Sequence, residues 1–144
     1  MTVSVPSPTA FRHRLRVYWE DTDAGGVVFY ANYLRFFERA RTEWLRALGF
    51  GQQALKDRHA LMFVVAATAV RYLRPARLDD ELDVTVAVTA AGRATLDIAQ
   101  QAWRGDTLLA EGEIRIGCVD AATFAPRRIP PPIADAATLH ALAR

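Results

Sequence analysis

The clearest pattern in the chain is a run of large apolar residues at helical spacing, from Tyr33 to Leu48. The charged residues of this segment fall largely on the other side. Asn32 suits an N-cap, and Gly49 suits the position that follows the C-cap. The spacing predicts one helix of about five turns, roughly 25 Å long.

Most of the remaining chain shows patterns typical of β-strands. Residues 61–73 are apolar at both alternating sets of positions, which predicts a strand buried on both faces. Residues 81–90 alternate cleanly, with leucine and valine on one face. Acidic residues and glycines mark residues 20–26 as a loop. The C-terminal stretch, 125–144, holds four prolines and is predicted to wrap the surface, with a short helix from Ala134. The predicted strands are 12–19, 61–73, 81–90, 93–104 and 108–119.

This order of elements predicts an α+β fold. Five strands make a sheet roughly 24 Å wide, whereas one helix covers about 10 Å. The sheet must therefore curl round the helix or be covered by a partner, and the second case predicts a dimer. The length of 144 residues fits one domain. We expect residues 1–10 to form a flexible leader and residues 11–144 a single domain.

The amino-acid composition indicates the class of protein and its cellular compartment, but it says little about the reaction. Apolar residues make up 51% and charged residues 24%, which is ordinary for a globular protein. A single cysteine, Cys118, fits a reducing compartment. No signal peptide and no apolar run of membrane-spanning length stand out, so we expect a cytoplasmic protein. The weak basic bias, a net charge of +2, suits anionic small molecules as well as nucleic acid. Nucleic acid has less support, because no basic stripe with interleaved aromatics appears.

Several familiar kinds of catalytic site have little support. His13, His59 and His140 lie far apart and in no metal-ligand spacing. No serine lies in a nucleophile-elbow sequence, and Cys118 has the pattern of a small buried hydrophobe. We therefore expect no metal site.

The acidic loop is the strongest candidate for chemistry. Glu20, Asp21 and Asp23 fall within four positions, just before Gly25-Gly26 and the start of the long helix. A helix start offers unpaired N–H groups that can polarise a carbonyl oxygen. A nearby carboxylate can attack that carbonyl or activate water. The alternative is that these acids only fill a turn and favour a helix start, and the residues by themselves leave both interpretations open.

The stretch from Val17 to Val28, VYWEDTDAGGVV, resembles the signature of hotdog-fold thioesterases of the 4-hydroxybenzoyl-CoA type. It is most similar to the bacterial branch associated with the Tol-Pal envelope system. The similarity covers nearly all of the chain beyond residue 10. It continues through residues 31–34, 37–46, 75–80, 118–120 and 126–127.

The resemblance implies a long central helix wrapped by a curved antiparallel sheet. It implies homodimers, often paired into tetramers, with active sites at the dimer interface. The family's catalytic aspartate falls on Asp23, and the N–H that polarises the thioester carbonyl falls near Tyr30. Coenzyme A enters only as part of the acyl-CoA substrate, with no further cofactor, and an envelope partner is possible. The branch commonly has histidine where this chain has Tyr30, and tyrosine there resembles the 4-hydroxybenzoyl-CoA enzymes.

Further residues are candidates for binding the substrate. Glycines in the acidic loop allow the backbone to approach a ligand closely. Ala67 and Thr68 lie in the middle of a predicted strand, where they could line the acyl pocket of the partner subunit. Arginines suit the phosphates of coenzyme A. An arginine in such a position is more often a solvated surface residue, and Thr68 could equally be a plain core threonine. The candidates are Gly25, Val28, Ala67, Thr68, Arg71, Arg74, Arg93 and Arg128.

Acyl-CoA hydrolysis is thus the leading hypothesis, with Asp23 as nucleophile or general base. A hotdog dehydratase is one alternative, although such enzymes generally need a histidine and the motif contains none. A non-catalytic module that binds acyl-CoA or docks an envelope partner is another, although binding alone does not require Asp23.

Overall fold

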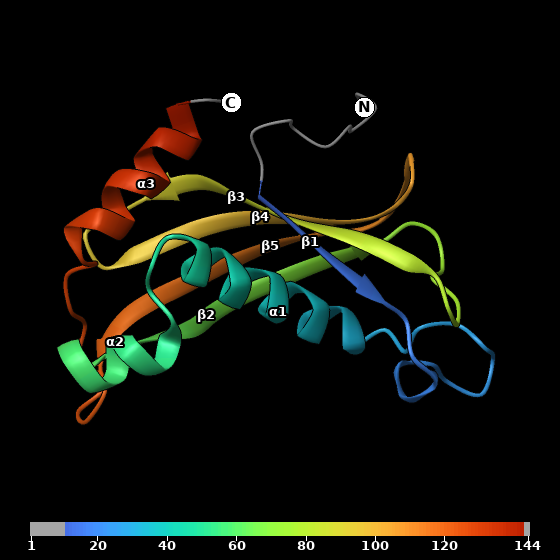
Figure 1. The fold of residues 1–144 in the computed structure, drawn as a ribbon, viewed down its shortest axis with the longest axis horizontal. Helices are drawn as coiled ribbons and strands as arrows, with labels where there is room; N and C mark the ends of the chain where they lie inside the picture. The colour runs from blue at the N-terminus through green and yellow to red at the C-terminus, as the bar shows by residue number, and fades with distance from the viewer. Residues whose placement is uncertain (1–10, 143–144) are drawn as a thin grey trace.

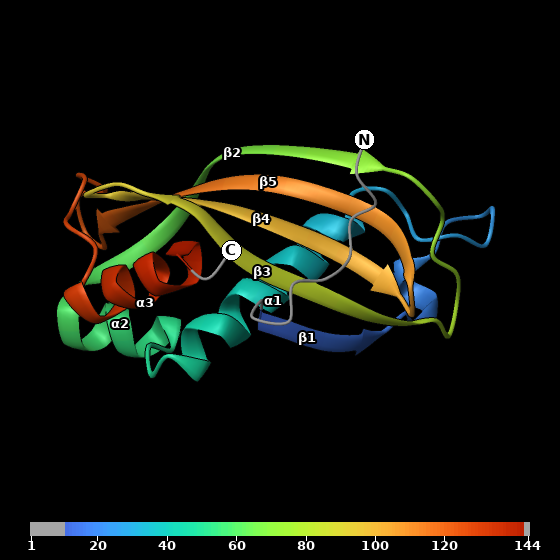
Figure 2. The ribbon, with the colours of Figure 1, turned by 90° about the horizontal axis from the view of Figure 1, so that it is seen from above.

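A five-stranded antiparallel sheet curves around one long helix (Figures 1 and 2). The computed structural model describes residues 11–142. The strands lie in the order β1-β3-β4-β5-β2, so β3, β4 and β5 form a meander with β1 and β2 at its edges. The strands are β1 Phe11–Arg16, β2 Leu61–Tyr72, β3 Glu81–Ala91, β4 Thr95–Arg104 and β5 Thr107–Asp120. The helices are α1 Asn32–Ala47, α2 Gln52–His59 and α3 Pro131–Leu142.

The core lies between α1 and the concave face of the sheet. The apolar stripe of α1 is buried there, and the inner residues of β3, from Leu82 to Val88, have no exposed surface. Gly112 on β5 allows α1 to pack closely against the sheet, because a Cβ at this position would lie 3.0 Å from the ring of Phe37. These features confirm the predicted α+β hotdog fold, with a long helix held in a curved sheet.

Polar side chains are also buried between α1 and the sheet. Gln100 of β4 is fully buried and donates to the main-chain oxygens of Phe37 and Thr85, at 3.0 and 3.3 Å. Its side-chain oxygen accepts a 2.8 Å hydrogen bond from Arg41 of α1. Arg41 is only 9% exposed, and burial lowers the pKa of its guanidinium. The amide of Gln100 therefore links the helix to the sheet at mid-length.

Two sequence-based boundaries at the start of the chain were wrong. The first strand ends at Arg16 rather than at residue 19, because the chain turns into a single 3₁₀ turn, Trp19–Asp21. The carboxylate of Asp21 accepts from the main-chain N–H of Tyr18 and holds this turn. Asn32 was predicted as an N-cap but lies inside α1, whose N-cap is Ala31.

The rest of the chain differs from the predictions in three places. Helix α2 was not predicted. Helix α3 begins at Pro131, three residues before the predicted Ala134, where a proline suits the first helical position. Strand β2 was predicted to be buried on both faces, but residues 65–69 are exposed and Val65 is 53% exposed. Among the described strands β2 lies at the edge of the sheet and pairs with β5, so one side of it is not covered by another strand of residues 11–142.

Two predictions about the domain organisation of the chain stay predictions. The proposed leader, residues 1–10, lies outside the described residues, and the single-domain division of residues 11–144 is untested. Over the described residues, none of the helices has both the length and the apolar run needed to cross a bilayer.

Candidate active site

Asp23 lies in a tight loop between the 3₁₀ turn and α1. Thr22 and Val28 pair as an isolated bridge at the base of this loop. The main-chain N–H of Asp23 donates to the oxygen of Val27 at 2.9 Å, and Gly26 donates back to Asp23 at 3.0 Å. Gly26 has a φ of +80°, a conformation that glycine adopts without strain. The sequence Gly25-Gly26 thus closes a turn that presents Asp23 at its start.

The Asp23 carboxylate is exposed, and one of its oxygens has a fixed partner. Oδ1 accepts a 2.8 Å hydrogen bond from the N–H of Gly25. A Cβ on Gly25 would lie 3.2 Å from that same oxygen, so only glycine fits without displacing it. Within the described part of the chain, Oδ2 has no hydrogen-bond or ion-pair partner. This oxygen is free to act on a substrate or on water.

The loop is fastened to α1 by a buried polar pair. The amide of Asn32 donates to the main-chain oxygen of Asp21 at 3.0 Å and lies 3.4 Å from its carboxylate. Asp21 is 5% exposed and Asn32 is 8% exposed. Asp21 is therefore part of the scaffold, and the exposed Asp23 remains available for chemistry.

A second loop, residues 75–80, packs against the end of the acidic loop at Val27 and Val28. The N–H of Val28 donates to Ala76 at 2.8 Å, and Val27 forms a bridge with Arg77. Asp80 holds this supporting loop, since its carboxylate accepts from the N–H of Arg77 and from the guanidinium of Arg104, both at 2.9 Å. The sequence motif at residues 75–80 thus has a structural role beside the acidic loop.

The main chain just before α1 carries unused donors. Among the described residues, none accepts a hydrogen bond from the N–H of Tyr30 or of Ala31. The positive end of the helix dipole adds to their attraction for a partial negative charge. The predicted backbone donor near Tyr30 is therefore available in this fold.

Three tyrosines meet beside these donors. Tyr30, Tyr33 and Tyr72 line a cavity of about 260 Å³ together with Val28 and Arg74. The hydroxyl of Tyr72 donates to the main-chain oxygen of Tyr30 at 3.0 Å, while that of Tyr33 accepts from a main-chain N–H at 3.3 Å. Burial raises the pKa of Tyr33, and partial desolvation raises that of Tyr72. Both phenols therefore stay protonated at neutral pH.

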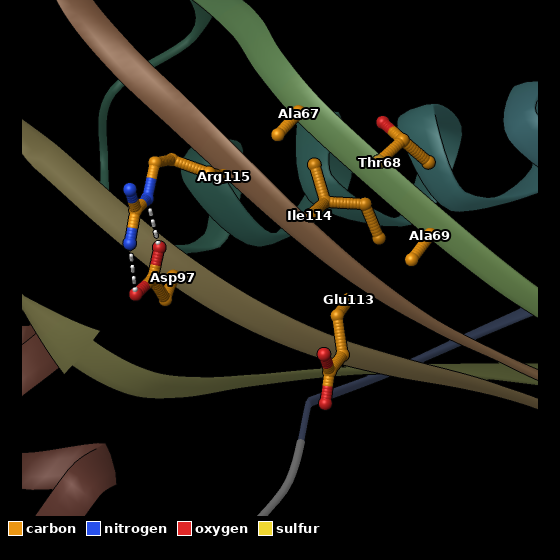
Figure 3. A pocket seen from close by; sticks show the side chains of 7 residues that line it. All are labelled: Ala67, Thr68, Ala69, Asp97, Glu113, Ile114 and Arg115. Carbon is orange, nitrogen blue, oxygen red and sulfur yellow. Dashed lines mark hydrogen bonds and ion pairs between the residues drawn. The ribbon is translucent and has the colours of Figure 1, made fainter.

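Two other candidates, Ala67 and Thr68, lie elsewhere on the molecule. They line a groove of about 270 Å³ on β2, β4 and β5 (Figure 3). An ion pair between Arg115 and Asp97, at 2.7 Å, crosses one side of this groove. Neither Asp23 nor Tyr30 contributes to it. Arg71 also lies apart from the loop and pairs with Glu111 at 2.8 Å.

The remaining two arginine candidates share a third location. Arg93 and Arg128 line one cavity of about 470 Å³ beside α3. The two segments are joined directly, because the N–H of Ile129 donates to the oxygen of Arg93 at 2.9 Å. This cavity lies at the end of the sheet where β2 begins, because Cys118 bonds to Ala94 and pairs with the first residues of β2. Tyr72 is the last residue of β2 and lies at the opposite end of that strand.

The candidate residues thus form separate groups in one chain. Asp23 and Gly25 share the tight loop, and Val28, Tyr30 and Arg74 share the tyrosine-lined cavity. Sequence reasoning did not single out Tyr72, because its hydrogen-bond partner lies 42 positions away and no local pattern marks it. The described residues hold no group of three or more His, Cys, Asp or Glu side chains that could bind a metal ion. The prediction of no metal and no cofactor stays a prediction.

Comparison with known proteins identifies the family. The model of the thioesterase-like superfamily matches residues 17–137. The chain belongs to the thioesterase-like superfamily. The matched region includes the acidic loop, α1 and the whole β3-β4-β5 meander, so superfamily membership rests on the candidate site as well as on the fold.

Individual members of the superfamily are similar over most of the chain. An acyl-CoA thioesterase YbgC from Haemophilus influenzae is 45% identical, over 83% of this chain and 88% of the relative. An acyl-CoA thioester hydrolase YbgC from Escherichia coli is 46% identical, over 85% of this chain and 91% of the relative. The crystal structure of a probable thioesterase from Bartonella henselae is 33% identical, with a TM-score of 0.82, and covers 85% of this chain and all of that one. These similarities confirm the prediction of a hotdog thioesterase, and the YbgC names are consistent with the predicted branch.

Proposed function

We propose that this protein hydrolyses acyl-CoA thioesters to a free acid and coenzyme A, with Asp23 as the catalytic carboxylate. The observation that carries the proposal is the combination of a free Asp23 oxygen and unpaired N–H groups at Tyr30 and Ala31. The acyl-CoA activities in the names of the YbgC relatives support the substrate class.

The chemistry uses these groups in two alternative ways. In one, Asp23 attacks the thioester carbonyl carbon, the C–S bond breaks, and coenzyme A leaves as a thiolate that takes a proton. Water then hydrolyses the mixed anhydride and restores the carboxylate. In the other, Asp23 removes a proton from water as the water attacks the same carbon; the C–S bond then breaks, and the coenzyme A thiolate takes up the proton that Asp23 held. Both need N–H donors for the negative charge that develops on the carbonyl oxygen.

A thiol-release assay over short, long and aromatic acyl-CoAs tests the proposal, with Asp23→Asn as the matched variant. We expect turnover on at least one substrate and a loss of about a hundredfold or more in Asp23→Asn. Wild-type turnover in Asp23→Asn would overturn the assignment of Asp23. Binding without thiol release would favour the non-catalytic module, and hydration of an enoyl-CoA would favour the dehydratase.

Acid quench during turnover, followed by intact-mass measurement, separates the two roles of Asp23. An adduct of acyl mass on the wild type, absent from Asp23→Asn, supports the nucleophile. Turnover with no such adduct at any quench time supports the general base.

We also propose that the active form is a homodimer joined along β2. Within the described residues this strand has one unpaired edge, and residues 65–69, which are apolar except for Thr68, are exposed; proteins normally cover such an edge. Antiparallel pairing of β2 with its copy would bring the Leu61 end of one chain beside the Tyr72 end of the other. Arg93 and Arg128 of one chain would then approach the tyrosine-lined cavity of the partner, where they could bind the phosphates of coenzyme A.

Complementation tests this arrangement. Asp23→Asn homodimers and Arg93→Ala/Arg128→Ala homodimers should both be weak, whereas mixing and re-forming dimers should restore one intact site in each heterodimer. Recovery of up to half the wild-type turnover per heterodimer supports arginines supplied in trans. No recovery, in a sample shown to contain heterodimers, would contradict it.

A further inference from the structure

Tyr72 makes an unusual contact for a residue at the end of an edge strand. Its hydroxyl donates to the main-chain oxygen of Tyr30 at 3.0 Å, just before α1 begins. Its ring packs edge-on against the rings of Tyr30 and Tyr33, with centroids 6.2 and 5.4 Å apart. Tyr72 therefore holds the helix start through both a polar and an aromatic contact.

The hydrogen bond acts on a peptide group with an unused donor. The peptide unit is planar, and in the trans form its C=O and N–H point in opposite directions. The carbonyl of Tyr30 belongs to the same unit as the N–H of Ala31, which has no partner among the described residues. By fixing the carbonyl, Tyr72 also fixes the direction of this N–H. A hydrogen bond to the carbonyl polarises the unit and strengthens the N–H as a donor.

The hydroxyl of Tyr33, which lines the same cavity, does not bond to this peptide group. The hydroxyl of Tyr33 accepts from the N–H of Ala76 at 3.3 Å, on the loop that supports Val28. Tyr72 is also suited to stay a donor, since partial desolvation raises its pKa. The two hydroxyls thus have different tasks within one cavity.

We propose that Tyr72 is a positioning residue for thioester hydrolysis, which orients and polarises the Tyr30–Ala31 peptide so that its N–H binds the thioester oxygen. This inference rests on the proposed function. Because the hydroxyl acts through the peptide and not on the substrate, its removal should weaken transition-state stabilisation and leave substrate binding largely unchanged.

The test is Tyr72→Phe, which keeps the ring contacts and removes only the donor. We expect kcat on the best acyl-CoA to fall about three- to tenfold, the size of effect that one modest hydrogen bond supplies, with KM within twofold of wild type. Thr89→Val is the matched control. The Thr89 hydroxyl also donates to a main-chain oxygen, that of Asp97 at 3.1 Å. Thr89 lies near the C-terminal end of β3 and does not line the tyrosine cavity, so we expect wild-type kinetics.

Each outcome has one meaning. A higher KM with unchanged kcat, or unchanged values of both, would overturn the role of Tyr72. An equal fall in Thr89→Val would show a general effect of hydroxyl loss and would also overturn it. If Tyr72→Phe had a lower melting temperature, kcat would be measured well below that transition, where a purely structural role predicts recovery to the wild-type value. The proposed function fails separately, through wild-type turnover in Asp23→Asn.

Discussion

The side-chain amide of Asn32 donates to the main-chain oxygen of Asp21 across 3.0 Å and so joins the first residue of α1 to the loop that presents Asp23. Both residues are buried, and the same amide lies 3.4 Å from the Asp21 carboxylate. This contact couples the position of the catalytic candidate to the start of the helix whose N–H groups would work with it.

Replacing Asn32 with alanine should affect both stability and turnover. The main-chain oxygen of Asp21 would keep only the N–H of Phe29, and Oδ1 of its buried carboxylate would lose its donor. We therefore expect the free energy of unfolding to fall by about 1–3 kcal/mol in urea titrations. The rate of thiol release should fall as well, because the loop is no longer held against α1. Gln52→Ala is the control, since its amide bonds the hydroxyl of Thr42 on the surface and should cost less than about 0.5 kcal/mol. Equal costs in the two variants would contradict the role of Asn32.

Gly25→Ala should lower turnover with little change in stability. The new Cβ would lie 3.2 Å from Oδ1 of Asp23, tighter than ordinary van der Waals contact, and would push the carboxylate aside. We expect thiol release to fall about three- to tenfold, because catalysis depends steeply on the placement of reacting groups. Gly117→Ala, on β5, has nothing within 4 Å of the added Cβ and serves as the control. Full activity in Gly25→Ala would show that the Asp23 carboxylate tolerates a different position.

The buried link between Arg41 and Gln100 predicts a non-additive pair of mutations. Gln100→Leu leaves a buried guanidinium without its 2.8 Å partner, so we expect a loss of about 3 kcal/mol in unfolding free energy. The double variant Arg41→Met/Gln100→Leu removes both polar groups and should be clearly more stable than Gln100→Leu alone. Urea titrations of the two single variants and the double variant measure the coupling energy. Additive losses would show that the two side chains act independently.

The sequence predicted the elements whose patterns are local. The stripe of α1 and the alternation in β3 are set by residues a few positions apart, and each was found close to its observed bounds. Helix α2 was missed because its eight residues contain only Leu55 as a buried anchor and carry no amphipathic stripe. The apolar pattern of β2 led to a prediction of burial on both faces, but residues 65–69 in the middle of this edge strand are exposed.

The candidate site was predictable only in part, because the sequence reveals contacts between residues a few positions apart and not contacts between distant segments. Asp23 and the glycines lie within one short motif, so their proximity follows from the chain itself. The contact between Tyr72 and Tyr30 depends on the sheet curving back to the start of α1 and leaves no trace in local spacing. The separation of Arg93 and Arg128 from Asp23 likewise appears only once the strands are arranged in space.

Asp120, the last residue of β5, should make the fold sensitive to acid. Main-chain N–H groups of Ala122 and Thr123, at 2.9 and 3.0 Å, and the guanidinium of Arg127 stabilise its charged form and lower its pKa below the ordinary value. Because the folded-state pKa is the lower one, the carboxylate stabilises the fold above the unfolded-state pKa of about 4. This stability is lost as the pH falls through the folded-state value.

Urea titrations at pH 6, 4 and 3 check this prediction. The stability difference between the wild type and Asp120→Asn should be largest at pH 6 and shrink towards pH 3. Arg127→Ala should keep most of the pH dependence, because the hydrogen bonds from Ala122 and Thr123 lower the pKa more than the ion pair does. If Arg127→Ala lost the dependence as completely as Asp120→Asn, the ion pair would be the dominant cause. A difference between wild type and Asp120→Asn that stayed constant with pH would show that the turn does not favour the charged carboxylate.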